Sequence, residues 1–197
     1  MASVVITGDT SGSITLAAPA VAGTNTLTLP ANTGTVITTA SSGQSIPRAA
    51  LPAGAVLQVV NNTIQTVGNY FSTSSSSLVS TGVSVSITPS SSTNKVLLTV
   101  NATVDLGANN GGIQGTIYRG ATNLGGSSTA IMATYYIGIN SAGIANGTMS
   151  MSFLDSPSTT SSTTYTIYVA SSGGAATVIF GTQGRNTISF TAQEIAA

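Results

Sequence analysis

Only eight of the 197 residues carry a formal charge at neutral pH. Charged residues make up 4% of the chain, whereas about 25% is usual in globular domains. The surface must therefore consist mainly of uncharged polar residues, such as serine, threonine, asparagine and glycine. Such a surface offers little material for acid–base chemistry, metal binding or phosphate recognition, but it suits tight turns and close packing between identical copies. The low charge content therefore favours a structural protein that works as an assembly.

Four basic and four acidic residues give a formal net charge of zero. Without net charge there is no electrostatic repulsion between copies, which favours their association. The basic residues are scattered, whereas nucleic-acid binding needs clustered lysine and arginine, so we expect no nucleic-acid partner. The charged residues are Asp9, Arg48, Lys95, Asp105, Arg119, Asp155, Arg185 and Glu194.

The residue types that catalysis needs are largely missing. The chain has no histidine and no cysteine, which removes the usual general base, the commonest metal ligand and the thiol nucleophile. A Ser–Lys pair would have to use Lys95, the only lysine, which we interpret as a solvated charge at the start of a strand. A glycosidase would need two carboxylates to converge, and nothing in their spacing indicates this. We therefore predict no catalytic residue, no cofactor and no enzyme activity.

A calcium ion on the axis of a trimer is a further alternative, because one aspartate would then appear three times in the site. Asp105 and Asp155 are the candidates, but no Asp-rich loop surrounds either of them. Asp155 stands in the sequence LDSP, which is typical of a turn after a strand. We interpret both residues as turn or pairing residues and predict no metal site.

No apolar run approaches the roughly 18 residues that a membrane span requires, so we expect no membrane association. The first ten residues lack the basic region of a secretory signal, and the absence of cysteine suits synthesis in a reducing cytosol. An uncharged polar surface suits exposure outside a cell. A virion protein that is assembled in the host cytoplasm and released by lysis satisfies both conditions, and so does export without a cleavable signal.

The residue pattern predicts an all-β protein. Valine, isoleucine and threonine are frequent, glycine and serine recur at intervals of roughly 8 to 12 residues, and no amphipathic window is long enough for a helix. In residues 1–50 the predicted strands are very short. They cover residues 3–7, 13–16, 25–29 and 35–38.

Strands this short cannot bury a core of their own, and the chain has no cysteine for a disulfide. We therefore predict that residues 1–50 form an attachment or shaft segment, in which several chains intertwine and share one core. The alternative is a flexible polar tail, but the alternation in 13–16 and 26–29 is too regular for a linker. The predicted shared core consists of Ile14, Leu16, Leu27, Leu29, Val36 and Ile37.

Residues 51–197 are predicted to form a head domain with longer strands, joined to the first segment by a proline-bearing connector at 45–53. The clearest strand covers 95–106, where six apolar residues at alternate positions share one face and mostly polar residues share the other. In the last strand, Ile188, Phe190 and Ala192 face together in the same way. Further strands are predicted at 55–60, 84–89, 113–119, 130–137, 148–154, 165–170, 177–180 and 187–194.

About nine strands in the head suit a single antiparallel β-sandwich of jelly-roll type. The dipeptide Asn110-Gly111 is a strong hairpin-turn signal after the strand at 95–106. Two adjacent aromatic pairs, Tyr70-Phe71 and Tyr135-Tyr136, would each place one ring on the outside. An exposed tyrosine can stack on a host cell-surface glycan or pack against a neighbouring subunit, and we favour the subunit contact.

One N-terminal stretch, SGSITLAAPAVAGTNTLTLPANTGTVIT at residues 11–38, closely resembles a module of tail fibres and other fibrous virion proteins of tailed bacteriophages, especially marine and cyanobacterial ones. Later phrases are similar to the same group and follow the same order. They are LPAGAVLQVV at 51–60, VSITP at 85–89, TIYRG at 116–120, FLDSP at 153–157 and TAQEI at 191–195.

This resemblance implies a trimeric fibre or spike with a slim N-terminal segment, a globular C-terminal β head and other virion proteins as partners. It implies no catalytic residues. Because long tail fibres are usually much larger, a short tail fibre, spike or baseplate-associated fibre fits the length better. The alternatives are a head fibre or cement protein that decorates the capsid, a bacterial surface adhesin or glycan-binding module and, least favoured, a depolymerase.

Overall fold

The computed structural model describes residues 3–7, 11–17, 24, 51–65, 68, 70–106, 111–137, 145–172, 177–181 and 187–197. The chain divides into two units, Met1–Ser45 and Ile46–Ala197. The described residues contain strands and turns but no helix, and hence no helix that could cross a membrane.

In the first unit the described residues form one antiparallel hairpin. Strand β1 (Ser3–Thr7) pairs with β2 (Ser13–Ala17), as the sequence predicted for 3–7 and 13–16. A two-stranded hairpin is only marginally stable by itself, and the side chains of Val5 and Ile6 are more than half exposed. The shared core stays a prediction, because most of it lies outside the described residues: Leu27, Leu29, Val36, Ile37 and the side chains of Ile14 and Leu16.

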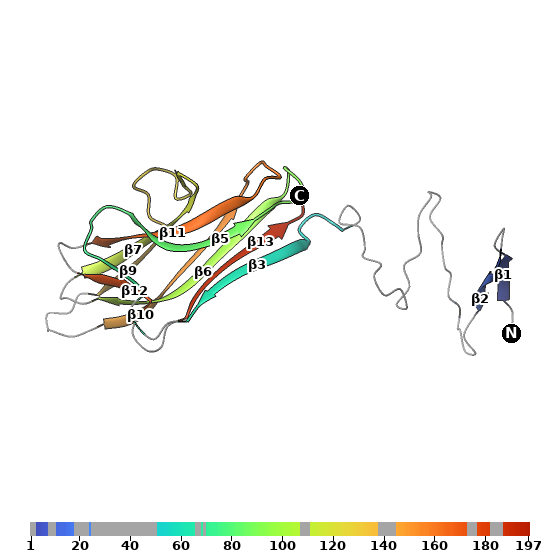
Figure 1. The fold of residues 1–197 in the computed structure, drawn as a ribbon, viewed down its shortest axis with the longest axis horizontal. Helices are drawn as coiled ribbons and strands as arrows, with labels where there is room; N and C mark the ends of the chain where they lie inside the picture. The colour runs from blue at the N-terminus through green and yellow to red at the C-terminus, as the bar shows by residue number, and fades with distance from the viewer. Residues whose placement is uncertain are drawn as a thin grey trace. The chain divides into compact units, whose positions relative to one another are not determined.

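In the second unit the described residues form two antiparallel sheets (Figure 1). The first sheet consists of β3 (Val56–Ile64), β4 (Phe71–Thr73), β6 (Lys95–Leu106), β10 (Ala145–Asp155), β12 (Val178–Phe180) and β13 (Ile188–Ile195). The second sheet consists of β5 (Val79–Ile87), β7 (Gly111–Arg119), β8 (Thr122–Asn123), β9 (Ala133–Ile137) and β11 (Thr163–Ser172).

In three places, two strands lie end to end beside the same neighbour, and we count each such pair as one line of the sheet. Both β12 and β13 pair with β6, and Phe180 lies opposite Val104 while Ile188 lies opposite Ala102, so the two strands form one broken line. In the same way, β4 and β3 form one line beside β12 and β13, and β8 and β9 form one line beside β7.

Counted as lines, the described strands of the second unit number eight, in the order 1-8-3-6 in the first sheet and 2-7-4-5 in the second. Every connection between successive lines crosses from one sheet to the other, except the one from β7 to the line of β8 and β9. This is the arrangement of a jelly roll. The prediction of an all-β sandwich of jelly-roll type is confirmed.

The hairpin predicted at Asn110-Gly111 is wrong. Strand β6 ends at Leu106 and β7 begins at Gly111, but the two strands belong to different sheets and do not pair. A turn signal is local, whereas the partner of each strand is decided by which sheet can bury its apolar face. The very short strands β4 and β8 were not predicted from the sequence, and the strand predicted from residue 84 begins at residue 79 in β5.

The core lies between the two sheets and follows the alternation that the sequence predicted for 95–106 and 187–194. The six alternating apolar residues of β6 are at most 1% exposed, and those of β13 are fully buried. Tyr165, Phe180 and Phe190 are the largest buried side chains of this core. The alternate residues of β6 are Val96, Leu98, Val100, Ala102, Val104 and Leu106.

The break between β12 and β13 depends on Gly181. This residue has φ of +79°, and its carbonyl accepts a hydrogen bond from the Tyr70 N–H over 2.9 Å. A Cβ at this position would lie 2.8 Å from Tyr70 Cβ and 2.9 Å from Ile188 Cδ1. We expect Gly181→Ala to lower the free energy of unfolding by about 2 kcal/mol, because strain in the backbone adds to a steric clash.

Urea unfolding checks this, with Gly120→Ala as the matched control. Gly120 also has a positive φ, but a Cβ there would meet no atom within 4 Å. Gly120→Ala therefore measures the cost of backbone strain without a steric clash. Equal losses of stability in the two variants would contradict the packing role of Gly181.

Candidate functional site

An ion pair between a buried aspartate and a partly exposed arginine joins the two sheets at one end of the head. The Arg119 side chain, on β7, donates from one nitrogen to both carboxylate oxygens of Asp155, on β10, over 2.8 Å each. The Tyr165 hydroxyl donates to the same carboxylate over 2.7 Å. Burial and the neighbouring Asp155 carboxylate raise the pKa of Tyr165 far above its ordinary value, so its hydroxyl stays a donor. Asp155 ends β10 as a pairing residue, and these three hydrogen bonds hold its carboxylate in place.

A second buried carboxylate, Glu194 on β13, fixes the connection between β5 and β6. Its Oε1 accepts from the N–H and the hydroxyl of Ser90 and from Asn94 Nδ2, over 2.6 to 2.7 Å, and its Oε2 accepts from Gln58 Nε2 over 2.5 Å. Burial alone would raise the pKa of this carboxyl, but the hydrogen bonds outweigh it and lower the pKa to about 2. Glu194 is fully buried, so it works as a structural anchor.

A third carboxylate, Asp105 on β6, is buried without such support. Its Oδ1 has no hydrogen-bond partner within the described part of the chain. Burial raises the pKa of Asp105, and a hydrogen bond from the Leu106 backbone opposes this only in part. An ionised carboxylate in this position costs stability, because it has lost water and gained little in return.

We expect Asp105→Asn to raise the free energy of unfolding at neutral pH by about 1 kcal/mol, since the amide keeps the shape and removes the charge. The gain should shrink in acid, because Asp105 then binds a proton in the folded head as well. Urea unfolding at pH 7 and pH 4 measures both effects. If Asp105→Asn instead lowered the free energy of unfolding at pH 7, the ionised Asp105 carboxylate would have a stabilising partner in the folded head.

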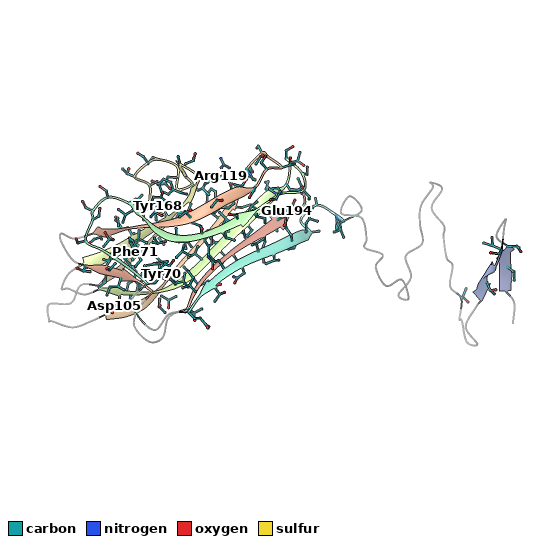
Figure 2. All side chains as sticks on the ribbon, in the orientation of Figure 1. Tyr70, Phe71, Asp105, Arg119, Tyr168 and Glu194 are labelled. Atoms are coloured by element: carbon teal, nitrogen blue, oxygen red, sulfur yellow. The ribbon has the colours of Figure 1, made fainter. Side chains whose placement is uncertain are left out.

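These arrangements leave the described part of the head surface with almost no charge. Of the five charged residues that the structure describes in the second unit, Asp105, Asp155 and Glu194 are buried, and Arg119 is bound to Asp155. Only Lys95, at the start of β6, is exposed among them, as we interpreted it from the sequence. Asp155 and Glu194 lie in one row across the first sheet, on either side of Val96, and each is bonded to its own partners. Asp105 lies at the other end of β6, away from Glu194 (Figure 2).

The outward side chains of β3, β13, β6 and β10 form a nearly charge-free surface, which we call the uncharged face. Hydrogen bonds tie its side chains together: Asn61 Nδ2 donates to Thr191 Oγ1 over 2.7 Å, and Ser150 Oγ donates to Asn101 Oδ1 over 2.6 Å. Two rows across the sheet contain only serine, threonine and asparagine: Asn61, Thr191, Thr99, Ser152 and Thr63, Ser189, Asn101, Ser150.

Apolar side chains replace the hydroxyl groups at one end of the uncharged face. Val59, Leu97 and Leu154 lie in one row across the sheet, together with Gln193. Val59 is 57% exposed, Leu154 49% and the nearby Val56 52%, and these three are the large apolar residues that are exposed in the described part of the head. Exposed apolar side chains gathered in one place indicate a contact surface.

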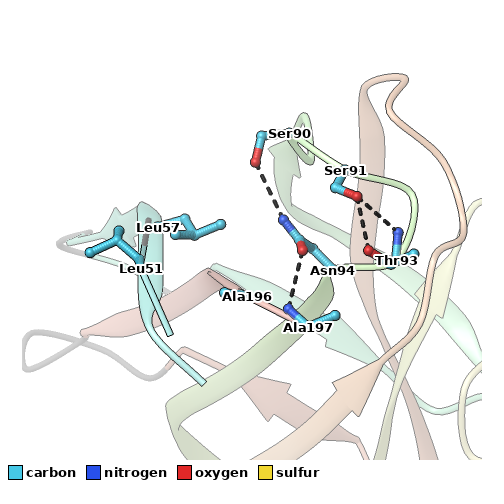
Figure 3. Close-up of a pocket in the computed structure, with 8 residues that line it drawn as sticks. All are labelled: Leu51, Leu57, Ser90, Ser91, Thr93, Asn94, Ala196 and Ala197. Atoms are coloured by element: carbon cyan, nitrogen blue, oxygen red, sulfur yellow. Dashed lines mark hydrogen bonds between the residues drawn. The ribbon is translucent and has the colours of Figure 1, made fainter. Parts of the chain in front are cut away.

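A hollow opens beside the Glu194 anchor (Figure 3). Its polar side chains bond to one another, since Asn94 Nδ2 donates to Ser90 Oγ, and Ser91 and Thr93 share a hydrogen bond of 2.9 Å. No ionisable side chain lines it, and the described residues contain no acidic cluster that could hold a metal ion. The lining residues are Leu51, Leu57, Ser90, Ser91, Thr93, Asn94, Ala196 and Ala197.

The aromatic pairs singled out in the sequence lie against the core. Tyr70 and Phe71 are both half-buried and packed on it, instead of one ring facing outward, and Tyr135 packs on it as well. The side chain of Tyr136 lies outside the described residues, and the role of these residues as subunit or receptor contacts stays a prediction. A different pair, Tyr118 and Tyr168, has rings that stack across neighbouring strands, and no local sequence pattern marks it.

No protein-family model matches the chain, and no curated protein sequence matches it. Among solved structures, it is similar to one of the infectious bursal disease virus Gx strain, at 14% identity and a TM-score of 0.37, with 80% of this chain and 42% of that chain covered. A VP2 subviral particle of the same virus gives 13% identity and a TM-score of 0.37, covering 73% and 39%. The chain thus spans less than half the length of these two chains.

Proposed function

We propose that the chain is a structural virion protein of a tailed bacteriophage. It forms a short tail fibre, spike or baseplate-associated fibre, works as a homotrimer, contacts other virion proteins and catalyses no reaction. Residues 1–50 attach it or form a shaft, and the jelly-roll head is displayed toward the host surface. The resemblance of residues 11–38 to tail-fibre modules supports the viral source and the shaft.

The observation that carries the proposal is the disposition of the charges in the head. An enzyme keeps ionisable groups accessible in a cleft, whereas the described carboxylates of this head are buried, and Asp155 and Glu194 are bonded to their own internal partners. What the head offers instead is the uncharged face with its exposed row of Val59, Leu97 and Leu154. Its described outward side chains carry one exposed charge, Lys95, in the row at its end beside Val56. The rest of the face can pack against a copy or another neutral protein without the cost of burying an ion.

Imaging of labelled copies on purified particles of the virus that encodes the chain tests the proposal. We expect the label at one vertex or along the tail. Label over the whole shell would instead indicate a protein that decorates the capsid, and a complete lack of label on particles would contradict a virion role.

A pair of lysine variants tests the contact surface within the same assay. Leu154→Lys places a charge on the uncharged face, and Thr164→Lys places one at an exposed position of the second sheet as the matched control. We expect the first variant to be incorporated into particles at least tenfold less, because the contact would bury an unpaired ammonium, and the control to be incorporated normally. Equal incorporation of the two variants into particles would show that the uncharged face is not a contact surface.

A further inference from the structure

We propose that the outer face of the second sheet carries a binding site for a neutral glycan, centred on Tyr118 and Tyr168. This inference rests on the proposed role of the head in host attachment and names the chemistry that the head would recognise. The two residues come from β7 and β11, and their ring centroids lie 4.0 Å apart with 28° between the ring planes. Both rings are partly exposed, while Ile117 and Ile167 beside them point into the core and are fully buried.

The neighbouring strand β5 departs from regular pairing next to Tyr168, which Figure 2 shows on the second sheet. Thr166 lies opposite Ser84, but Tyr168 lies opposite Ser80, so β5 bulges between these two pairs, at Gly82 with φ of +77°. The residue across from the Tyr168 ring is therefore a small exposed serine. Bulges of this kind often lie next to binding sites, because they re-aim the side chains around them.

On the other side, the segment between β8 and β9 supplies hydroxyl groups. The Tyr118 hydroxyl donates to the Ser128 carbonyl over 3.2 Å, which ties this segment to the ring pair. The segment is held from within by Asn123, which accepts from Thr116 Oγ1 over 2.7 Å and donates to the Ala130 carbonyl over 2.9 Å. Its exposed residues are Gly125, Gly126, Ser127, Ser128 and Thr129.

This combination fits a neutral sugar better than other ligands. Aromatic rings held in place by stacking offer an apolar surface to the C–H groups of a pyranose, and serine and threonine hydroxyls can bond to its hydroxyl groups. An anionic ligand would need a cation, but the nearby Arg119 is bound to Asp155 on the inner side of the sheet. The exposed large apolar residues that mark a protein contact lie on the uncharged face of the other sheet.

The test uses the full chain on an array of neutral oligosaccharides, built from glucose, galactose, mannose and N-acetylglucosamine, with sialylated and sulfated ones for comparison. We expect binding to a neutral member that Tyr168→Leu weakens at least tenfold, and that Tyr168→Phe retains within about threefold because the ring remains. Thermal unfolding shows whether each variant is folded. If Tyr168→Leu does not fold, Tyr118→Leu is used in its place.

Three results would overturn the site: no binding to any neutral member at millimolar concentration, stronger binding to the anionic members, or binding that the leucine variants leave unchanged. Particle imaging distinguishes failure of the proposed function from failure of the site. If the proposed function is wrong, labelled copies are missing from particles whether or not the protein binds a glycan. If Tyr168→Leu instead lowered incorporation into particles without any glycan binding, the ring pair would be a subunit contact.

Discussion

Replacing Glu194 by glutamine is expected to lower the free energy of unfolding at neutral pH by about 3 kcal/mol. The pKa of this carboxyl falls from an ordinary 4.5 to about 2 in the folded head, which reflects how strongly its donors favour the charged form. A glutamine would turn an amide N–H₂ group toward donors of Ser90, Asn94 or Gln58. The Gln58 amide cannot simply flip, because its Nε2 also donates to the Thr88 carbonyl over 2.7 Å.

The same residue predicts how stability depends on pH. Between pH 4.5 and pH 2 the unfolded chain binds the proton at Glu194 and the folded head does not, so the wild type should lose stability as the pH falls through this interval. Above pH 4.5 the contribution of Glu194 should be constant. Urea unfolding as a function of pH measures this, and Glu194→Gln should remove this part of the acid loss. An unchanged acid slope in the variant would show that Glu194 is not the group responsible.

Loss of the Asp155 carboxylate is expected to lower the free energy of unfolding by about 2 to 3 kcal/mol, because the buried Tyr165 hydroxyl is left without its acceptor while the partly exposed Arg119 keeps access to water. In Asp155→Ala the Arg119 guanidinium loses both of its 2.8 Å bonds, and the buried Tyr165 hydroxyl loses its acceptor. The measurement is urea unfolding of the single variant.

The matched control for Asp155→Ala is the double variant Asp155→Leu with Arg119→Met, which removes both charges together. It should be closer to the wild type than the single variant, because no unpaired ion then remains. If the double variant is no more stable than Asp155→Ala, the cost lies in packing and the ion pair is not the cause.

The alternation of apolar residues made the strands and the core predictable. In β13 it even points to the anchor, since Glu194 follows Ile188, Phe190 and Ala192 at the same spacing and so must face the core. Asp155 follows Met149, Met151 and Phe153 in the same way. A charged residue at a core position of a strand was therefore the signal for both buried carboxylates, and it could have been read from the sequence.

The partners of these residues could not be predicted, because they depend on which strands become neighbours. Arg119 and Tyr165 meet Asp155 from the opposite sheet, and Tyr118 meets Tyr168 only because β7 and β11 pair in one register. The Asn110-Gly111 signal failed for the same reason. A local sequence pattern fixes the face of each strand, but the order of strands follows from burying all apolar faces at once.

Copies of this chain are proposed to associate through uncharged surfaces and to work as an assembly. Sedimentation velocity of the full chain at micromolar concentration, in low and in high salt, measures this association. We expect a species of three times the 19.4 kDa chain mass whose abundance does not change with salt, because no charged contacts are screened. A monomer in both conditions, or a trimer that dissociates as salt rises, would contradict it.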